Sequence, residues 1–203
     1  MSVLQPNDTR AVILTEARAV IDERGEAGLR VAGLAERCGV AVGLLYHYFK
    51  DRQALIAAVR AQQFAELVDA DIDTVDMNIA DATTVEGLLE ASVANFGANI
   101  DDEQRRANRW GRLAILAAAE HNEVLRNEIS AQQVRSARAL IDVIEKAQAR
   151  GLVRTDISAK AIALLVEAVP LGTVLADINP ETAPSQEEWL ALITELLLTF
   201  GPR

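Results

Sequence analysis

Cysteine, histidine and aromatic side chains are all scarce in this sequence. It contains one cysteine, Cys38, two histidines and 4% aromatic residues. A single cysteine excludes an internal disulfide framework and is typical of a protein from a reducing compartment. So few sulfur and imidazole groups do not assemble a zinc-type site, and we expect neither a metal nor another cofactor.

The sequence also lacks a long uninterrupted apolar run. The longest apolar stretch, 161–176, is shorter than the ~20 residues of a membrane span, and it contains Glu167 and Pro170. No basic and apolar leader opens the sequence, so we do not expect export. These features predict a soluble, cytoplasmic protein that has no membrane partner.

Positive charge is scarce outside the first part of the chain. The formal net charge is −10, yet residues 1–60 contain eight Lys and Arg against seven Asp and Glu. The remaining residues contain twelve against twenty-three. An acidic surface repels nucleic acid, so only the first sixty residues are suited to bind it.

Hydrophobic periodicity predicts an all-α protein of about nine helices, without strand-like alternation. The first helix starts near Asn7–Thr9 and stops between Gly25 and Gly28, and another starts after a cap at Asp51. The other expected helices cover 31–38, 41–48, 83–100, 102–120, 122–150, 157–177 and 185–200, with a break in the acidic segment 71–84. Pro170 is expected to bend the helix that contains it.

The two short helices 31–38 and 41–48 have the spacing of a helix-turn-helix. Gly39 permits the sharp turn between them. Leu34 and Ala35 on the first helix and Leu45 on the second are expected to form a small shared core. The second helix of such a motif enters the major groove of DNA. No nucleophile elbow, phosphate-binding glycine loop or paired carboxylates point to an enzyme.

Residues 10–55 resemble the DNA-binding domain of the tetracycline-repressor (TetR) family of bacterial regulators. The pattern "GV-x-x-G-x-LY-x-x-F-x-x-[KR]-x-x-L" carries the resemblance, through Gly25, Leu34, Ala35, Gly39, Val40, Gly43, Leu45, Tyr46, Phe49, Arg52 and Leu55. It implies an N-terminal helix-turn-helix domain, 1–50, followed by a helical effector-binding and dimerisation domain, 51–203. It also implies a homodimer that binds a palindromic double-stranded DNA operator.

The resemblance also implies which residues contact DNA. Val42, Gly43 and Leu44 take the positions that face base edges, while Tyr46 and His47 take those beside the phosphates. Arg52 replaces the usual lysine, and we expect it to reach phosphate together with Arg10 and Lys50. Val31 and Ala41 stand where the family often has a capping Thr or Ser. Because "AVGLL" offers few side-chain hydrogen bonds to bases, we expect modest specificity.

Helical phase suggests the residues of an effector pocket. The resemblance implies that the last two helices pair with their copies in a second subunit, and their apolar circumference also requires a partner. The pocket residues are Phe64, Val68, Leu89, Val93, Phe96, Asn99, Trp110, Leu113 and Gln133. The interface residues are Glu167, Leu171, Trp189, Ile193, Leu196, Leu197 and Phe200. A mostly apolar lining predicts a hydrophobic small-molecule effector. Glu167 requires a partner, and interface pairing is favoured slightly over effector contact.

Arg105, Arg109 and Arg112 share one helix face. They either bind an anionic effector or form a solvated surface, and local acidic neighbours favour the solvated surface. We therefore predict a ligand-responsive regulator, most simply a repressor released by its effector. Two alternatives stay open: an interaction adaptor whose helix-turn-helix no longer binds DNA, and, less favoured, an enzyme built on a helical bundle.

Overall fold

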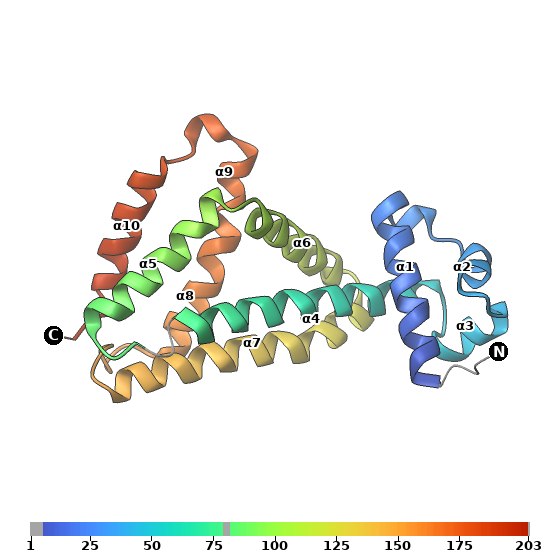
Figure 1. The fold of residues 1–203 in the computed structure, drawn as a ribbon, viewed down its shortest axis with the longest axis horizontal. Helices are drawn as coiled ribbons and strands as arrows, with labels where there is room; N and C mark the ends of the chain where they lie inside the picture. The colour runs from blue at the N-terminus through green and yellow to red at the C-terminus, as the bar shows by residue number, and fades with distance from the viewer. Residues whose placement is uncertain (1–5, 79–81, 203) are drawn as a thin grey trace. The chain divides into compact units, whose positions relative to one another are not determined.

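The computed structural model describes residues 6–78 and 82–202, with side chains described over 9–73, 82–97 and 102–202. Across these ranges the chain forms ten α-helices, one 3-10 turn and no strand (Figure 1), which confirms the all-α prediction. In chain order the elements are α1 (Pro6–Gly28), α2 (Val31–Cys38), α3 (Val42–Tyr48), α4 (Arg52–Asn78), α5 (Val85–Asp101), α6 (Glu103–Glu120), α7 (Glu123–Ala149), α8 (Ala159–Gly172), α9 (Val174–Ile178), η1 (Pro180–Thr182) and α10 (Gln186–Leu198).

One expected helix, 157–177, is divided into α8 and α9. Pro170 has no N–H to donate, and the chain is interrupted three residues later at Thr173. The Thr173 N–H lies 3.3 Å from the Val169 oxygen and 3.2 Å from the Pro170 oxygen. Its hydroxyl also donates to the Pro170 oxygen at 2.7 Å. The proline therefore accompanies an interruption rather than the bend that we expected.

The expected break over 71–84 was placed too early, because α4 continues to Asn78. Asp and Thr residues suggested a turn, but Asp71 in this segment and Asp69 just before it are paired with arginines on other helices. Arg135 on α7 donates to Asp69 at 2.5 Å, and Arg112 on α6 is ion-paired with Asp71. Long-range partners of this kind stabilise a helix that local propensity disfavours.

The chain divides into two compact units. The first comprises the described residues up to Ala65 together with Ala118–Ser130, and the second comprises Glu66–Ala117 and Ala131 onward. Helices α4, α6 and α7 therefore each contribute residues to both units.

The first unit is built around a small apolar core on α1 to α4. Its most deeply buried members include Ile13, Leu29, Leu34, Leu45 and Leu55. Gly39 adopts the left-handed conformation (φ 66°, ψ 30°) that the turn after α2 needs, as the sequence predicted. The predicted cap at Asp51 is also confirmed, because the Ala54 N–H donates to its carboxylate at 2.8 Å.

The second unit contains two closely packed helix pairs. Helix α10 lies along α5 (Figure 1), and the Trp189 indole N–H donates to the Phe96 carbonyl oxygen at 3.4 Å. A Cβ atom on Gly97 would lie 2.8 Å from the Cδ2 methyl of Leu190, so a larger residue there would require the leucine side chain to shift. A separate apolar cluster joins α7 to α8 through Leu140, Ile144, Ala159, Ile162 and Ala163.

Candidate nucleic-acid interface and effector cavities

Helix α3 divides its side chains between the core and the solvent. Leu45 is 2% exposed and anchors the helix, whereas Val42 is 40% exposed and Tyr46 is 52% exposed. Gly43 and His47 are exposed as well, and Leu44 is half-buried. The residues expected to contact DNA therefore form one accessible surface on a helix that the core holds in place.

Neither helix of the motif is capped by a side chain at its N-terminus. Arg30 precedes α2 and Ala41 precedes α3, and both have extended backbone without a capping hydrogen bond. The missing hydroxyl at Ala41 agrees with the sequence-based expectation.

Arg52 has a different environment from the one expected. Its Nε donates to the Leu29 carbonyl oxygen at 2.9 Å, and its Nη2 donates to the carbonyl oxygen of Glu26. These bonds satisfy carbonyl groups around the end of α1, where Gly25 interrupts the helix with φ 67°. In this structure the guanidinium connects α4 to α1 rather than projecting toward a ligand.

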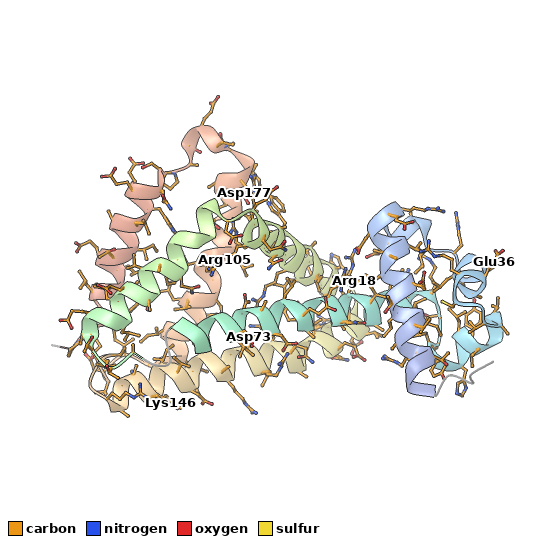
Figure 2. All side chains as sticks on the ribbon, viewed as in Figure 1. Arg18, Glu36, Asp73, Arg105, Lys146 and Asp177 are labelled. Carbon is orange, nitrogen blue, oxygen red and sulfur yellow. The ribbon has the colours of Figure 1, made fainter. Side chains whose placement is uncertain are left out.

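Two other cations predicted to contact DNA remain at the surface. Arg10 lies over the Phe49 ring with 5.4 Å between its guanidinium carbon and the ring centroid. Lys50 is exposed directly after α3. On the other helix of the motif, Glu36 is exposed and lies on the side of α2 away from α1 (Figure 2).

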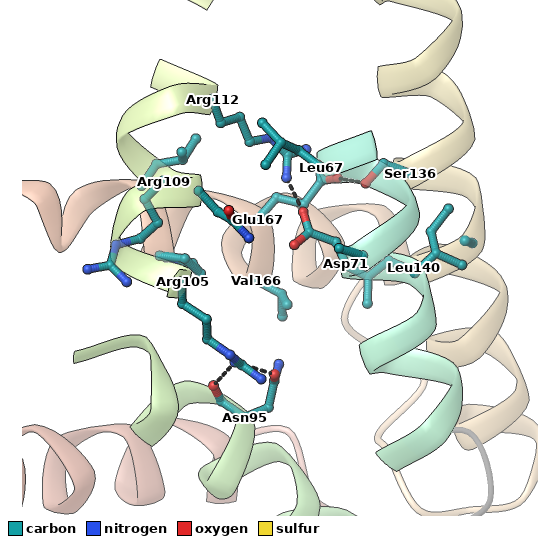
Figure 3. Close-up of a pocket in the computed structure, with 16 residues that line it drawn as sticks. Leu67, Asp71, Asn95, Arg105, Arg109, Arg112, Ser136, Leu140, Val166 and Glu167 are labelled. Carbon is teal, nitrogen blue, oxygen red and sulfur yellow. Dashed lines mark hydrogen bonds and ion pairs between the residues drawn. The ribbon is translucent and has the colours of Figure 1, made fainter. Parts of the chain in front are cut away.

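One cavity in the second unit has a volume of about 160 Å³, and its wall combines apolar residues with three arginines and two carboxylates (Figure 3). It is lined by Leu67, Ala70, Asp71, Ile72, Asn95, Arg105, Asn108, Arg109, Arg112, Ser136, Ala139, Leu140, Val166, Glu167, Pro170 and Leu171. We call it the polar cavity. Its three arginines come from one face of α6, as their spacing predicted.

These arginines do not form a solvated surface, so the interpretation that we favoured from the sequence is wrong. Arg109 is 5% exposed, and its guanidinium lies 3.6 Å from Asp177 on α9. Arg112 is ion-paired with Asp71 on α4 and donates to Gln133 at 3.3 Å. Burial lowers the pKa of Arg109, and Asp177 opposes that effect. Arginines can point inward here because carboxylates distant in sequence compensate their charge.

Arg105 is held by neutral oxygens instead of a carboxylate. Its Nη1 donates to both the carbonyl and the side-chain oxygen of Asn95 on α5, each at 2.9 Å (Figure 3). Arg105 therefore connects α6 to α5 while its positive charge stays in the polar cavity.

Glu167 has neutral partners in the same cavity. The Ser136 hydroxyl donates to one carboxylate oxygen at 2.9 Å, and the Gln133 amide donates to the other at 3.1 Å. The structure thus places Glu167 and Leu171 in the cavity wall, although we expected both at the dimer interface. The pKa of Asp71 is raised, mainly by desolvation, although Arg112 and Arg105 counteract this.

The second cavity has a volume of about 110 Å³ and an almost wholly apolar wall. Its lining residues are Val85, Leu88, Leu89, Ser92, Asn95, Phe96, Leu140, Val143, Ile144, Ala147, Leu152, Val153, Ile162, Val166, Leu197, Leu198, Phe200 and Gly201. We call it the apolar cavity. Among the pocket residues predicted from the sequence, Leu89 and Phe96 lie in its wall.

The other predicted pocket residues have different positions. Phe64 and Val68 are fully buried, Val93 is half-buried, and none of them is among the described lining residues. Gln133 donates a hydrogen bond to Glu167. The side chain of Asn99 lies outside the described residues. Helical phase alone did not identify which apolar positions face a cavity.

Trp110 and Leu113, which we expected in the effector pocket, do not line either cavity. They are 40% and 37% exposed, and the Trp110 indole donates to Asp177 on α9 at 3.0 Å. Figure 2 shows Asp177 on α9, where Arg106 also reaches it at 3.1 Å. The arginine face of α6 lines the cavity, which leaves the tryptophan face outside.

Part of the expected dimer interface is used within the chain. Ile193 is 2% exposed, and Leu197 and Phe200 line the apolar cavity. Trp189 is bonded to Phe96, while Leu196 is half-buried. This face of α10 packs inside the second unit, because α10 is apolar around most of its circumference and α5 covers that side.

A different set of large apolar side chains is exposed on α8, α9 and α10. Its members are Leu164, Leu165, Leu175, Ile178, Leu192 and Leu198, with exposed fractions from 37% to 75%. We call this set the apolar face. Large apolar side chains that are exposed on neighbouring elements are candidates for an association surface.

The stretch Ala159–Ile178 has a mean hydropathy of 1.9, so by length and composition it could cross a membrane. In the structure it is interrupted at Thr173 and contains Glu167, which has polar partners on α7. Ile162 and Ala163 pack against α7. This is the environment of a helix in a bundle.

Comparison with known proteins agrees with both the motif and the fold. The family model described as "Bacterial regulatory proteins, tetR family" matches residues 13–59. The HTH-type transcriptional regulator BetI of Burkholderia cenocepacia is 29% identical over 171 residues, covering 82% of each chain.

Solved structures match almost the whole chain. A TetR-family regulator structure from Rhodococcus sp. has a TM-score of 0.64 and 24% identity, covering 95% of this chain and 98% of that one. A transcriptional regulator from Saccharomonospora viridis in complex with choline has a TM-score of 0.63 and 16% identity, covering 97% and 100%. The helix-turn-helix segment 13–59 therefore matches the tetracycline-repressor family of bacterial regulators, and the chain as a whole shares its fold with solved transcriptional regulators.

Proposed function

We propose that the chain is a homodimeric repressor that binds a palindromic DNA operator and is released by a small effector. Residues 1–50 form its DNA-binding domain, and residues 51–203 form its effector-binding and dimerisation domain. It acts in the cytoplasm as a binding protein rather than as an enzyme.

The observation that carries this proposal is the exposure pattern of α3. Leu45 fixes the helix in the core, while Val42, Gly43 and Tyr46 stay accessible on one surface. A recognition helix needs this combination, because it must be rigid and must also present side chains to the major groove. With few hydrogen-bonding groups, Val42 and Leu44 contact thymine methyl groups, and DNA shape supplies further selectivity.

The apolar face supports the homodimer. Leu175 is 75% exposed and Leu164 is 67% exposed, although both are large apolar side chains. A second copy that covers them makes a two-fold interface, which matches the two-fold symmetry of a palindrome. The helices of this interface agree with the sequence-based prediction, but the residues on α10 are Leu192 and Leu198 instead of Ile193 and Leu197.

The two cavities support effector control. They lie in the unit to which α4, α6 and α7 all contribute, and the same helices continue into the unit with the DNA-binding motif. An effector that favours one arrangement of these helices changes DNA affinity, and a coupling of about 1–3 kcal/mol is typical. The neighbour from Saccharomonospora viridis was solved with choline bound, so the fold accommodates small ligands.

The test of DNA recognition is a selection from a random duplex library with the purified full-length protein. We expect enrichment of one two-fold symmetric sequence, with half-sites about one helical turn, 34–36 Å, or a multiple of it apart. Tyr46→Ala should abolish enrichment, whereas Val124→Ala, at an exposed position away from α3, should preserve it. An unenriched library would reject the repressor and favour the adaptor.

The test of the dimer is sedimentation equilibrium of the wild type and of Leu175→Glu. The wild type should sediment as a dimer, and the added charge should produce monomers that retain helical content. The Ile193→Val change, at a buried position, should leave the dimer intact. A wild type that sediments as a monomer at micromolar concentration would contradict the homodimer without affecting the DNA-binding assignment.

A further inference from the structure

The polar and apolar cavities share part of their walls. Asn95, Leu140 and Val166 line both of them. One of these residues, Asn95, also accepts the two hydrogen bonds from Arg105. Arg105 is therefore fixed to a residue that borders both cavities.

Arg105 differs from its two neighbours on α6 in its charge balance. Arg112 has Asp71 as an ion-pair partner and Arg109 has Asp177, both within 4.0 Å. Within the described side chains, no carboxylate lies that close to the guanidinium of Arg105, whose partners are the two neutral oxygens of Asn95. A half-buried guanidinium that has only neutral acceptors favours an anionic ligand, because a carboxylate adds charge-assisted hydrogen bonds.

The remaining charges of the polar cavity do not provide an equivalent site for a cation. Among the described charged side chains that line this cavity, Glu167 is the only other one without an ion-pair partner. Both of its carboxylate oxygens already accept hydrogen bonds. No aromatic side chain is among the described lining residues of this cavity. Quaternary ammonium groups are usually bound by aromatic side chains, so such a head group fits poorly here.

The apolar cavity provides the complementary surface for a hydrocarbon chain. Leu88, Leu89 and Phe96 from α5 face Val143 and Ile144 from α7 across it. Only Ser92 and Asn95 bring polar side chains into its described wall. A ligand that occupies this cavity is therefore apolar along most of its length.

We propose that the two cavities form one site for a carboxylate-bearing amphiphile, with its carboxylate on Arg105 and its apolar chain against Phe96 and Leu89. The proposal rests on the proposed function only in naming this ligand class as the effector. Binding itself requires neither DNA nor a dimer.

The test is calorimetric titration of the full-length protein without DNA. The ligands are straight-chain carboxylates of increasing length, and alcohols and primary amines of matched length, all below their micellar concentrations. We expect the carboxylates to bind about tenfold or more tightly than the alcohols, as a charge-assisted hydrogen bond predicts. Each added methylene should strengthen binding about fourfold until the apolar cavity is full.

Substitutions separate the two halves of the site. Arg105→Met should remove the preference for carboxylates over alcohols, Arg105→Lys should retain part of it, and Arg138→Met, at an exposed position on α7, should leave it unchanged. Ser92→Phe should shorten the preferred chain, because the new ring fills part of the apolar cavity. Thermal unfolding of each variant verifies that it is folded.

Two results would overturn the proposal. Amines that bind more tightly than carboxylates and lose affinity in Glu167→Gln would assign the site to cations. Equal binding of all three classes in wild type and Arg105→Met would remove Arg105 from the site. DNA release is then measured separately: carboxylates that bind without releasing the operator would leave the site intact and contradict the effector role. Release of the operator by another ligand class, and not by carboxylates, would support effector control but contradict the assignment of carboxylates as the effector.

Discussion

Both units of the chain have an apolar interior, but they differ in where charged and exposed apolar side chains lie. In the first unit the interior is an apolar cluster that includes Leu34, Leu45 and Leu55, while its ion pairs lie near the surface, such as Arg37 with Glu16 at 3.0 Å. In the second unit Arg109 is buried beside a cavity, whereas Leu175 is largely exposed.

This difference corresponds to two different tasks. A unit that positions one short helix for a rigid polyanion benefits from a continuous core, because small displacements of the helix would misplace every contact. A unit that binds a small molecule and a second subunit must leave an internal cavity and an apolar surface unfilled. The following predictions test whether the two units differ in this way.

The largest expected effect is on the core of the first unit. Leu45→Ala removes a side chain that is 2% exposed, and should lower the free energy of unfolding by about 2–5 kcal/mol. The matched control Val124→Ala, 54% exposed in the same unit, should change it by less than about 0.5 kcal/mol. Urea unfolding followed by circular dichroism measures both, and equal values would mean that α3 is not anchored by its core face.

Arg52→Met tests whether this guanidinium supports the fold or contacts DNA. The loss of its bonds to Leu29 and Glu26 should lower the free energy of unfolding by about 1–3 kcal/mol. The dependence of DNA affinity on salt should keep its slope, since no phosphate contact is removed. Unchanged stability together with a slope reduced by about one would instead assign Arg52 to phosphate, as the sequence alone suggested.

Lys50→Ala should give the complementary result, with little loss of stability. Lys50 is exposed after α3, so its removal should weaken binding to all duplexes alike and reduce the salt slope by about one. Lys146 is exposed on α7 in the second unit, and Lys146→Ala should leave the DNA affinity and the salt slope unchanged. Fluorescence anisotropy over a salt series measures the slope, and an equal response to the two changes would remove Lys50 from the interface.

The smallest expected effect concerns Asp71 in the wall of the polar cavity. The pKa of Asp71 is raised in the folded state, mainly by desolvation. The unfolded chain therefore loses this proton at a lower pH than the folded protein does. As a result, the wild-type protein loses stability as pH rises through the folded pKa. The stability of Asp71→Asn relative to wild type should therefore increase as pH rises through the folded pKa, and this gain offsets part of the cost of removing the ion pair with Arg112.

Thermal unfolding across this pH range measures the Asp71 effect. The control is Asp69→Asn, which removes the neighbouring aspartate paired with Arg135. A relative stability of Asp71→Asn that falls as pH rises would show that pairing with Arg112 dominates over desolvation.

The sequence predicted the first unit well for a physical reason. Gly39, Leu45 and the apolar positions around them are close in the chain, and helical periodicity alone determines which face each occupies. The role of Arg52 was not predictable in the same way, because its partners at Glu26 and Leu29 are backbone carbonyls whose position depends on how α1 ends.

In the second unit the sequence predicted the helices but not their faces. The arginine face of α6 points inward because Asp71 and Asp177, on two other helices, compensate it. Nothing in the local pattern around Arg109 indicates those partners. Helix α10 is apolar on several sides, so its sequence did not determine that Ile193 would pack inside the unit while Leu192 stays exposed.

The most direct test of the central claim is fluorescence anisotropy with the selected duplex and a scrambled duplex over a salt series, with and without the tightest-binding ligand from the titrations. The account predicts tight, selective binding with a steep salt slope, loss of binding in Tyr46→Ala, and release by the ligand. Equal and weak binding to both duplexes, unaffected by Tyr46→Ala, would contradict the assignment of α3 as a DNA-reading helix.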